Sequence, residues 1–230
     1  LNLIRIGSMS DGGYLLPNIL DNIKYCFSAG VGNVCSFEKE LSKKYQIKSF
    51  MSDGSIHELP ENDENFFFLK KFISAITKNQ FITLSDWMLD SIGKNKMIND
   101  GKILQMDIEG SEYEVLTYES AETLRLFSII IIELHELQNL ANRNFLKMLS
   151  GNFEKIYKYF SICHVHPNNY CGVHKIGKIE VPGAIEVTFV RNDLIKKENL
   201  LTEIVLPHHL DCKTVKNIKD IKMPEIWWKK

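Results

Sequence analysis

The sequence predicts a single α/β domain built on an open, mostly parallel sheet. Residues 126–135 (LFSIIIIELH) are almost continuously apolar and β-branched, which is typical of a strand covered on both faces. Residues 25–45 have the order strand, glycine turn, helix, the unit from which parallel sheets are assembled. A chain of 230 residues is long enough to bury one substantial core.

The first elements are a turn and a strand–turn–helix unit. An apolar strip ends in Asp11-Gly12-Gly13-Tyr14; this is either turn chemistry alone or a turn that brings Asp11 or Tyr14 against a ligand. In residues 24–45 (KYCFSAGVGNVCSFEKELSKKY), Asn33 is the expected helix cap and Glu38 is expected to face water. The glycines let the backbone approach a ligand, and Cys35 at the third glycine position disfavours a pyrophosphate cofactor.

A second strand, predicted at residues 47–51, ends at Asp53-Gly54. Asp53 follows Gly32 by 21 positions, close to the spacing at which an acidic residue meets ribose hydroxyls in such units. The alternative is an ordinary turn Asp before Gly. The glycine turn, helix, strand and acid together predict a nucleoside site without a requirement for a diphosphate.

Two further segments lead to the central motif. Residues 66–73 (FFFLKKFI) are expected to form one strand, and residues 81–89 a short strand leading into a helix capped by Ser85. In residues 101–116 (GKILQMDIEGSEYEVL), Asp107 falls where a buried strand should end and Ser111 can cap a helix. Asp107 and Glu109 should then point into the crevice at the carboxyl ends of the strands, rather than being solvated loop carboxylates.

Polar pairs spaced two residues apart end two more predicted strands. Glu133 and His135 end one, and His164 and His166 end another that runs on to Asn168. We expect an acid–base cluster of Asp107, His135 and His166, with Glu133 oriented behind it, or a metal set of Asp107, His135 and His164. Oxygen-rich ligands would favour Mg²⁺ or Mn²⁺, and a metal-free histidine base stays open as the alternative.

The amino-acid composition disfavours several classes of protein. Lys and Arg total 28 against 29 Asp and Glu, and aromatic residues are not interleaved with basic ones, so nucleic acid is not indicated. We expect neither a membrane span nor a signal peptide, although the chain starts at Leu1 and could be part of a longer protein. The five cysteines lack a Cys-x-x-Cys spacing, which favours free thiols in a reducing cytoplasm.

The C-terminal part is expected to complete the domain. Residues 170–182 are glycine-rich and suit a lid or a hairpin loop, and residues 183–191 suit a last, antiparallel strand. We expect the domain to span residues 1–200. Residues 201–230 would form a tail whose terminal tryptophans dock on the domain or on a partner.

At this point the residues resemble a known family. Residues 27–41 (FSAGVGNVCSFEKEL) look like the S-adenosylmethionine-binding first motif of class I methyltransferases. Residues 82–86 (ITLSD) with residues 104–116 (LQMDIEGSEYEVL) resemble the FkbM-type pattern, in which Thr-Leu-Asp precedes a strand ending in Asp-x-Glu-Gly-x-Glu. The resemblance covers about residues 4–191. It implies a Rossmann-like sheet of seven strands with one antiparallel, S-adenosylmethionine as donor, and O-methylation, often of a sugar hydroxyl in a surface glycan or natural product.

The resemblance also assigns roles by position. Gly30 and Gly32 would line the methionine part of the donor, Asp53 would take the ribose hydroxyls, and Asp107 would lie beside the sulfonium. Ser28 is a further candidate contact to the donor. Glu109 and Glu112 would shape the site. Apart from the resemblance, the candidate acceptor contacts are Asp11, Tyr14, Glu109, Glu133 and Asn168. Ser85 and Asp53 depart from the family's commoner Asp and Glu, and no acidic residue ends the third strand for adenine.

Two other functions are compatible with the sequence. They are a nicotinamide-dependent sugar oxidoreductase or epimerase, and a binding domain of the same fold that has lost turnover. A homo-oligomer is equally compatible with the sequence.

Overall fold

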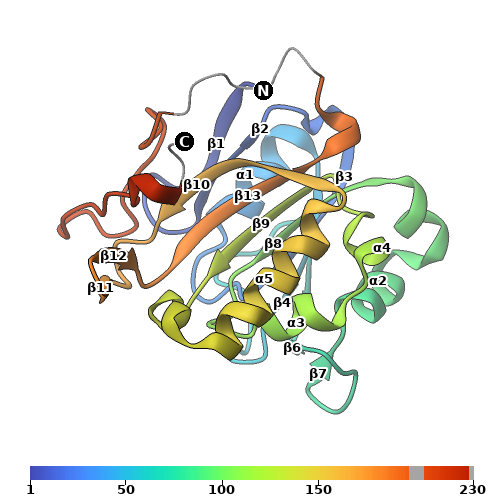
Figure 1. The fold of residues 1–230 in the computed structure, drawn as a ribbon. Helices are drawn as coiled ribbons and strands as arrows, with labels where there is room; N and C mark the ends of the chain where they lie inside the picture. The colour runs from blue at the N-terminus through green and yellow to red at the C-terminus, as the bar shows by residue number, and fades with distance from the viewer. Residues whose placement is uncertain (197–204, 228–230) are drawn as a thin grey trace.

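The computed structural model describes residues 1–196 and 205–227 (Figure 1). Within them, seven strands form one sheet in the order β10-β13-β9-β8-β3-β4-β5. Strands β3, β4, β5, β8 and β9 are mutually parallel, whereas β13 is antiparallel to both of its neighbours. This is the predicted mostly parallel sheet with one antiparallel strand.

The sheet strands and helices have the following bounds. The sheet consists of β3 (Ile23–Ala29), β4 (Lys48–Ser52), β5 (Phe66–Leu69), β8 (Gly101–Met106), β9 (Ile129–Leu134), β10 (Phe160–Pro167) and β13 (Ile185–Arg191). The helices are α1 (Ser36–Tyr45), α2 (Leu84–Asn99), α3 (Glu112–Tyr118), α4 (Ala121–Leu124) and α5 (Arg143–Tyr157). Short 3₁₀ turns are η1 (Leu20–Asn22), η2 (Leu137–Ala141), η3 (Asn192–Leu194) and η5 (Glu225–Trp227). Three small ribbons pair outside the sheet: β1 (Leu3–Gly7) with β2 (Gly13–Pro17), β6 (Phe72–Ile73) with β7 (Phe81–Ile82), and β11 (Val173–Ile176) with β12 (Ile179–Pro182).

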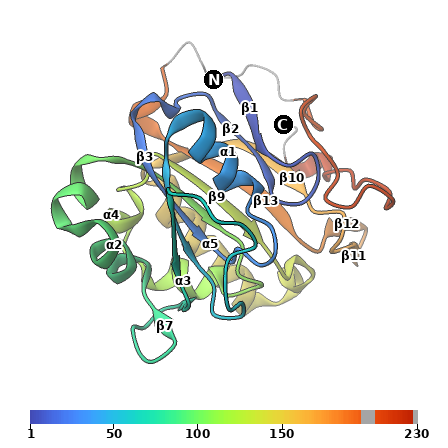
Figure 2. The ribbon, with the colours of Figure 1, turned by 180° about the vertical axis from the view of Figure 1, so that it is seen from behind.

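The sheet is the middle of three layers. Helix α5 crosses one face, with α2, α3 and α4 on the same side (Figure 1), and α1 with the β1–β2 hairpin covers the other (Figure 2). Along β9, Ile130 and Ile132 belong to the core under the α2–α5 layer, while Ile129 and Ile131 belong to the core under α1. This two-sided burial explains the continuous apolar run in the sequence.

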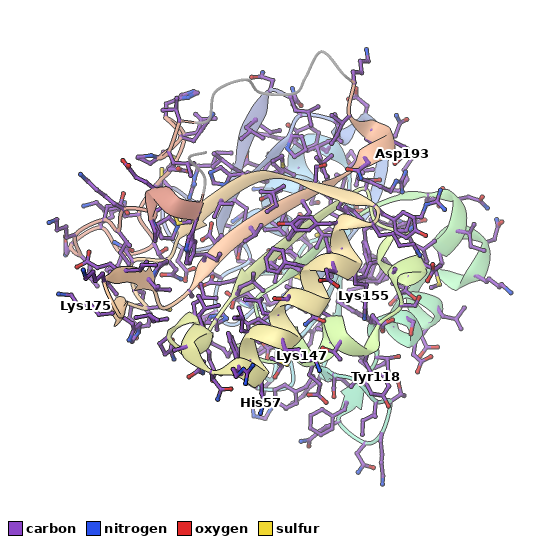
Figure 3. The ribbon with its side chains drawn as sticks, in the orientation of Figure 1. His57, Tyr118, Lys147, Lys155, Lys175 and Asp193 are labelled. Atoms are coloured by element: carbon purple, nitrogen blue, oxygen red, sulfur yellow. The ribbon has the colours of Figure 1, made fainter. Side chains whose placement is uncertain are left out.

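Side chains close the start of α2 and the end of α3, whereas Ser111 stands at the start of α3 without a side-chain cap hydrogen bond. Thr83 caps α2 by accepting the Asp86 N–H at 3.1 Å. Lys155 of α5 donates to the carbonyls of Leu116, Thr117 and Glu119 at 2.7–2.8 Å, which ties the end of α3 to α5 (Figure 3). A cation at a helix C-terminus is favourable because the last carbonyls carry partial negative charge.

Three local predictions were wrong. Residues 66–73 form two short strands rather than one, because the chain turns at Lys70 and Lys71, where the Lys71 N–H bonds the Leu69 carbonyl. Helix α1 starts at Ser36 with Cys35 as its cap, so Asn33 stays in the loop. The cap of α2 is Thr83 and not Ser85, because the helix starts at Leu84.

Two other expectations concern the C-terminal part and membranes. Residues 170–182 contain the β11–β12 hairpin, one of the two predicted forms. Within the described ranges, no helix combines the length and the apolar character needed to cross a membrane. Of the predicted tail, residues 201–204 and 228–230 lie outside the described residues.

Candidate functional site

A pocket of about 520 Å³ opens at the carboxyl ends of β3, β4 and β8. Eight residues singled out in the sequence line it: Asp11, Tyr14, Ser28, Gly30, Gly32, Asp53, Asp107 and Glu109. They come from four separate segments of the chain, so the fold brings most of the predicted site together. Ligand pockets of open α/β sheets occur at this edge.

The glycine turn after β3 packs directly on the end of β8. Gly30 has a φ of +81°, and a Cβ there would lie 1.6 Å from the Asp107 carbonyl oxygen. The Asp107 N–H in turn bonds the Ala29 carbonyl at 3.0 Å. Gly32, with a φ of +55°, has open space where its Cβ would be. Gly30 therefore allows two strand ends to meet, and Gly32 leaves room in the pocket.

Asp53 closes the turn from the end of β4. Its Oδ2 accepts the Gly32 N–H at 2.9 Å, and its Oδ1 accepts the backbone N–H and hydroxyl of Ser55 at 2.7 and 2.6 Å. Burial opposes ionisation of this carboxyl, but the hydrogen bonds from Ser55 and Gly32 prevail and lower its pKa. Asp53 is therefore held as an oriented carboxylate at the pocket wall.

Part of the pocket wall is aromatic. Phe72, Ile73, Ser74 and Phe81 line it, and the rings of Phe72 and Phe81 lie 5.8 Å apart. The sequence had placed both rings in strands only, without a site role. The sequence feature that could have indicated their place in the site is the pair of short apolar runs on either side of residues 74–80. The parallel pairing of β6 with β7 puts the two rings beside the pocket, and the local sequence pattern does not indicate this pairing.

A buried polar network forms the floor. The Ser28 hydroxyl contacts the Glu38 carboxyl and lies 2.6 Å from Gln105 Oε1, while Gln105 Nε2 donates to the Tyr14 hydroxyl at 3.1 Å. Glu38 is only 3% exposed, and its burial raises the pKa of its carboxyl. The expectation that Glu38 faces water was wrong, because α1 turns this position toward the strand that carries Ser28.

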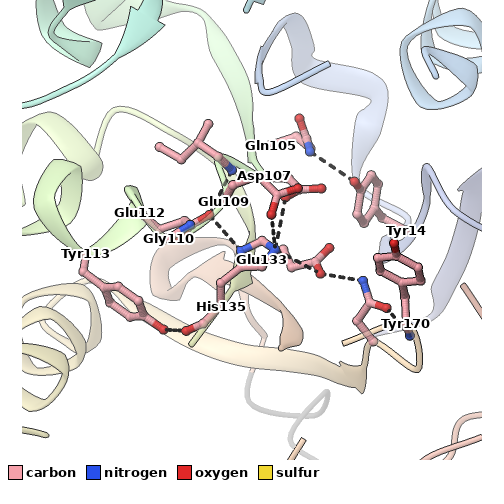
Figure 4. Close-up of polar contacts among 12 residues, drawn as sticks. Tyr14, Gln105, Asp107, Glu109, Gly110, Glu112, Tyr113, Glu133, His135 and Tyr170 are labelled. Atoms are coloured by element: carbon pink, nitrogen blue, oxygen red, sulfur yellow. Dashed lines mark hydrogen bonds and ion pairs between the residues drawn. The ribbon is translucent and has the colours of Figure 1, made fainter. Parts of the chain in front are cut away.

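His135 lies at the centre of a second group of polar residues next to Asp107 (Figure 4). Its Nδ1 is 3.1 Å from Glu112 Oε1. Its Nε2 lies 3.6 Å from Asp107 Oδ1, 3.6 Å from Glu109 Oε2 and 3.5 Å from Glu133 Oε1. Four carboxylates thus surround one imidazole.

Helix α3 orients the His135 ring. Glu112 is fully buried and accepts the N–H groups of Ile108 and Gly110 at 2.9 Å each, besides its contact with His135. The Tyr113 hydroxyl bonds the His135 carbonyl. The sequence hypothesis put Glu133 behind His135. The structure gives that place to Glu112, because Glu133 faces the other ring nitrogen and accepts from Asn168 at 2.6 Å.

The pKa values of Asp107, Glu133 and His135 are all raised, for different reasons. Desolvation, together with the nearby Glu133, raises the pKa of Asp107 to about 8, and desolvation together with Glu186 raises that of Glu133 to about 7. For His135, burial favours the neutral ring, but the hydrogen bond and charge of Glu112 outweigh it and raise the pKa to about 9. Burial and mutual repulsion thus favour the protonated form of the two carboxyls, and Glu112 favours the protonated imidazole.

His164 and His166 lie apart from this cluster. Strand β13 separates β10 from β9, and both histidines instead face Asp211 of the C-terminal segment: His164 Nε2 is 2.8 Å from Oδ1 and His166 Nδ1 is 3.5 Å from Oδ2. The predicted set of Asp107, His135 and His164 is not assembled. In the described part of the chain, the groups close enough to share an ion are Glu133–His135–Cys171 and Asp107–Glu112–His135.

Comparison with known proteins identifies the family. The model of the methyltransferase FkbM domain matches residues 17–164. The chain belongs to the FkbM methyltransferase family. The matched region contains the glycine turn, Asp53, the Asp107 motif and His135, and the resemblance drawn from the sequence is confirmed.

Other comparisons place this FkbM-family chain among distant structures. No curated protein matches it. Among solved structures, a chain of a fibrillarin/Nop5p complex aligns with a TM-score of 0.44 and 13% identity, covering 76% of this chain and 75% of that one. Precorrin-6y C5,15-methyltransferase from Geobacter metallireducens GS-15 aligns with a TM-score of 0.37 and 10% identity, covering 75% and 83%.

Proposed function

We propose that this FkbM-family methyltransferase transfers a methyl group from S-adenosylmethionine to a hydroxyl of a sugar, in a surface glycan or a glycan precursor. The observation that carries the proposal is the single pocket that joins the glycine turn and Asp53 to Asp107. Asp107 Oδ1 lies 3.6 Å from His135 Nε2, so the pocket leads from a nucleoside-sized cleft to a cluster able to accept a proton.

The donor would lie along the pocket from Phe72 to Asp107. Its adenine would pack on Phe72 and Phe81, and its ribose hydroxyls would bond Asp53, whose lowered pKa keeps it ionised. The methionine part would pass Ser28, Gly30 and Gly32, where open space is available at Gly32. The sulfonium would then face Asp107, and its positive charge would favour the ionised form of that carboxyl.

The acceptor would enter beside Asp107. Methyl transfer needs an alcohol oxygen in line with the S–CH₃ bond, and alignment supplies a large share of the barrier reduction, up to about 7–11 kcal/mol. Asp11, Tyr14, Glu109, Glu133 and Asn168 offer the acceptors and donors that a polyhydroxylated ligand requires. Of these, Asp11, Tyr14 and Glu109 line the pocket, and Asn168 and Glu133 bond each other behind it.

Proton removal is assigned to the cluster of Asp107 and His135. The oxygen gains the methyl group, its proton goes to the cluster, and S-adenosylhomocysteine leaves with the electron pair of the broken bond. His166 is no longer part of the proposed acid–base cluster. It lies on β10, faces Asp211 of the C-terminal segment, and is separated from β9 by β13.

The test is methyl transfer with purified protein. Radiolabelled S-adenosylmethionine would be offered with a panel of free sugars, nucleotide sugars and oligosaccharides, and product would be analysed for methyl ethers. We expect label in at least one sugar. Binding of S-adenosylmethionine without transfer to any acceptor would favour a binding domain, and binding of NAD in its place would favour a nicotinamide enzyme.

We also propose a cellular location and domain bounds. All five cysteines, which lie in the described ranges, are free thiols, and this supports a cytoplasmic location. We propose a domain of residues 1–200 with a tail of 201–230. The tail is supported by Trp227, which lines an apolar groove with Leu134, Leu137 and Phe153. Neither nucleic acid nor a fixed oligomeric state is part of the proposal.

A further inference from the structure

Cys171 extends the group around His135. The ligand-type atoms of Glu133, His135 and Cys171 all lie within 4.8 Å of one another. The backbone at Cys171 is held against the segment that leads into β13, since a Cβ on Gly183 would lie 2.3 Å from the Cys171 carbonyl oxygen. A carboxylate, an imidazole and a thiol thus converge from two segments of the chain, the end of β9 and the loop that contains Cys171.

The free nitrogen of His135 faces these groups without a hydrogen bond. His135 is 8% exposed, and within residues 1–196 and 205–227 its Nε2 makes no hydrogen bond, nor does the buried Asp107 Oδ1. The carboxylate oxygens around Nε2 lie at 3.5–3.6 Å, beyond the ~2.7–2.9 Å of a charge-assisted hydrogen bond. Ligand atoms ~2.0–2.2 Å from a tetrahedral ion are about 3.4 Å apart. This is close to the 3.5 Å between His135 Nε2 and Glu133 Oε1.

Glu112 completes the arrangement from behind. Metal-bound histidines commonly donate their other ring N–H to a carboxylate, which fixes the tautomer and aims the ligating nitrogen. Glu112, fully buried, stands 3.1 Å from His135 Nδ1 in this position. Both Glu112 oxygens accept a backbone N–H, from Ile108 and Gly110, whereas a single oxygen of Glu133 accepts, from Asn168. We therefore assign Glu112 as the support of the histidine and not as a ligand.

We infer that His135 Nε2, Glu133 and Cys171 bind one divalent transition-metal ion, Zn²⁺ or an ion of similar softness, with the fourth position facing Asp107. An imidazole and a thiolate select such ions over Mg²⁺, which prefers oxygen ligands. The sequence-based expectation of Mg²⁺ or Mn²⁺ had not counted Cys171. The role of the ion rests on the proposed function: an acceptor hydroxyl in the fourth position would have a lowered pKa, and Asp107 would take its proton.

Cobalt provides a readout that does not depend on activity. The full chain would be freed of metal with a chelator and titrated with Co²⁺. We expect the visible bands of a tetrahedral site and a thiolate-to-cobalt charge-transfer band in the near ultraviolet. Cys171→Ser should abolish the charge-transfer band. Cys163→Ser should keep it, because the Cys163 thiol on β10 bonds the Thr188 carbonyl.

A second pair of variants covers the case in which Cys171→Ser does not fold. Glu112→Gln should keep the charge-transfer band but weaken Zn²⁺ binding about 10–100-fold, measured by competition with a metal indicator. Glu154→Gln, at an exposed position on α5, should bind Zn²⁺ as the wild type does.

Two results would overturn the inference: no charge-transfer band in the wild type, or a band that persists in Cys171→Ser. If either occurs while calorimetry still detects S-adenosylmethionine binding and transfer continues in chelator, the metal site is lost and His135 acts as a metal-free base. Loss of donor binding in the folded wild type would instead refute the proposed function.

Discussion

Among the residues of the site, His135 should affect turnover most. It lies 3.5–3.6 Å from three carboxylates and is absent from the lining of the donor pocket. His135→Ala should therefore lower the methyl-transfer rate by about 100-fold or more and leave the affinity for S-adenosylmethionine nearly unchanged. Rates and calorimetry on the same preparation check this, with His57→Ala, an exposed histidine outside the pocket, as control. Wild-type turnover in His135→Ala would remove His135 from the mechanism.

Asp53 should act on donor affinity instead. It is the only carboxylate among the described residues that bonds the glycine turn, through Gly32, and hydrogen bonds to a charged group contribute about 1.5–3 kcal/mol. Asp53→Ala should raise the dissociation constant of S-adenosylmethionine about 10–100-fold. Asp90→Asn, on the exposed face of α2, serves as control. An unchanged constant in a folded Asp53→Ala protein would contradict the ribose contact.

At the scale of elements, the two glycines after β3 should behave differently. A Cβ at Gly30 would lie 1.6 Å from the Asp107 carbonyl, so Gly30→Ala must push the turn away from β8, and we expect a loss of several kcal/mol in the free energy of unfolding. Gly32→Ala meets no atom within 4 Å and should lose only about 1–2 kcal/mol for its positive φ. Its methyl group would instead occupy the pocket and weaken donor binding. Urea denaturation and calorimetry measure both effects, and equal stabilities would contradict the packing of the turn on β8.

The elements also mark the limit of what the sequence alone could predict. The Asp107 motif was predictable because strand, acidic loop and helix are contiguous, and local pattern fixes them. The place of Glu112 was not, since its contact with His135 joins α3 to β9. His164 and His166 were misplaced for the same reason: no local signal indicates that β13 inserts between β9 and β10. Asp211, which faces both histidines, lies in a segment without a clear period and was missed.

At the scale of the whole molecule, buried acids couple stability to pH. Glu186 pairs across the sheet with Glu133 on β9 and His166 on β10, and desolvation raises its pKa to about 7. A carboxyl with a raised pKa favours the folded state while protonated, so this contribution is lost as pH rises from ~4.5 through ~7. Glu186→Gln should equal the wild type in stability near pH 4.5 and exceed it by about 2 kcal/mol at pH 8. Urea denaturation across this range checks it, with Glu154→Gln as control. A difference that does not grow with pH would contradict the buried charge.

The sheet as a whole was predicted well because its apolar runs are long, and because both the pattern of residues 183–191 and the family resemblance indicated one antiparallel strand. What brings the site together is the order of the strands, in which β3 lies between β4 and β8 and so joins Asp53 to Asp107 through one glycine turn.

The proposed function requires that the pocket between the glycine turn and Asp107 binds S-adenosylmethionine. Calorimetric titration of the folded wild-type chain with S-adenosylmethionine tests this most directly. We expect saturable binding at one site, lost on addition of excess S-adenosylhomocysteine. Absence of binding to either compound by a chain whose circular dichroism and unfolding transition are those of a folded α/β domain would contradict it.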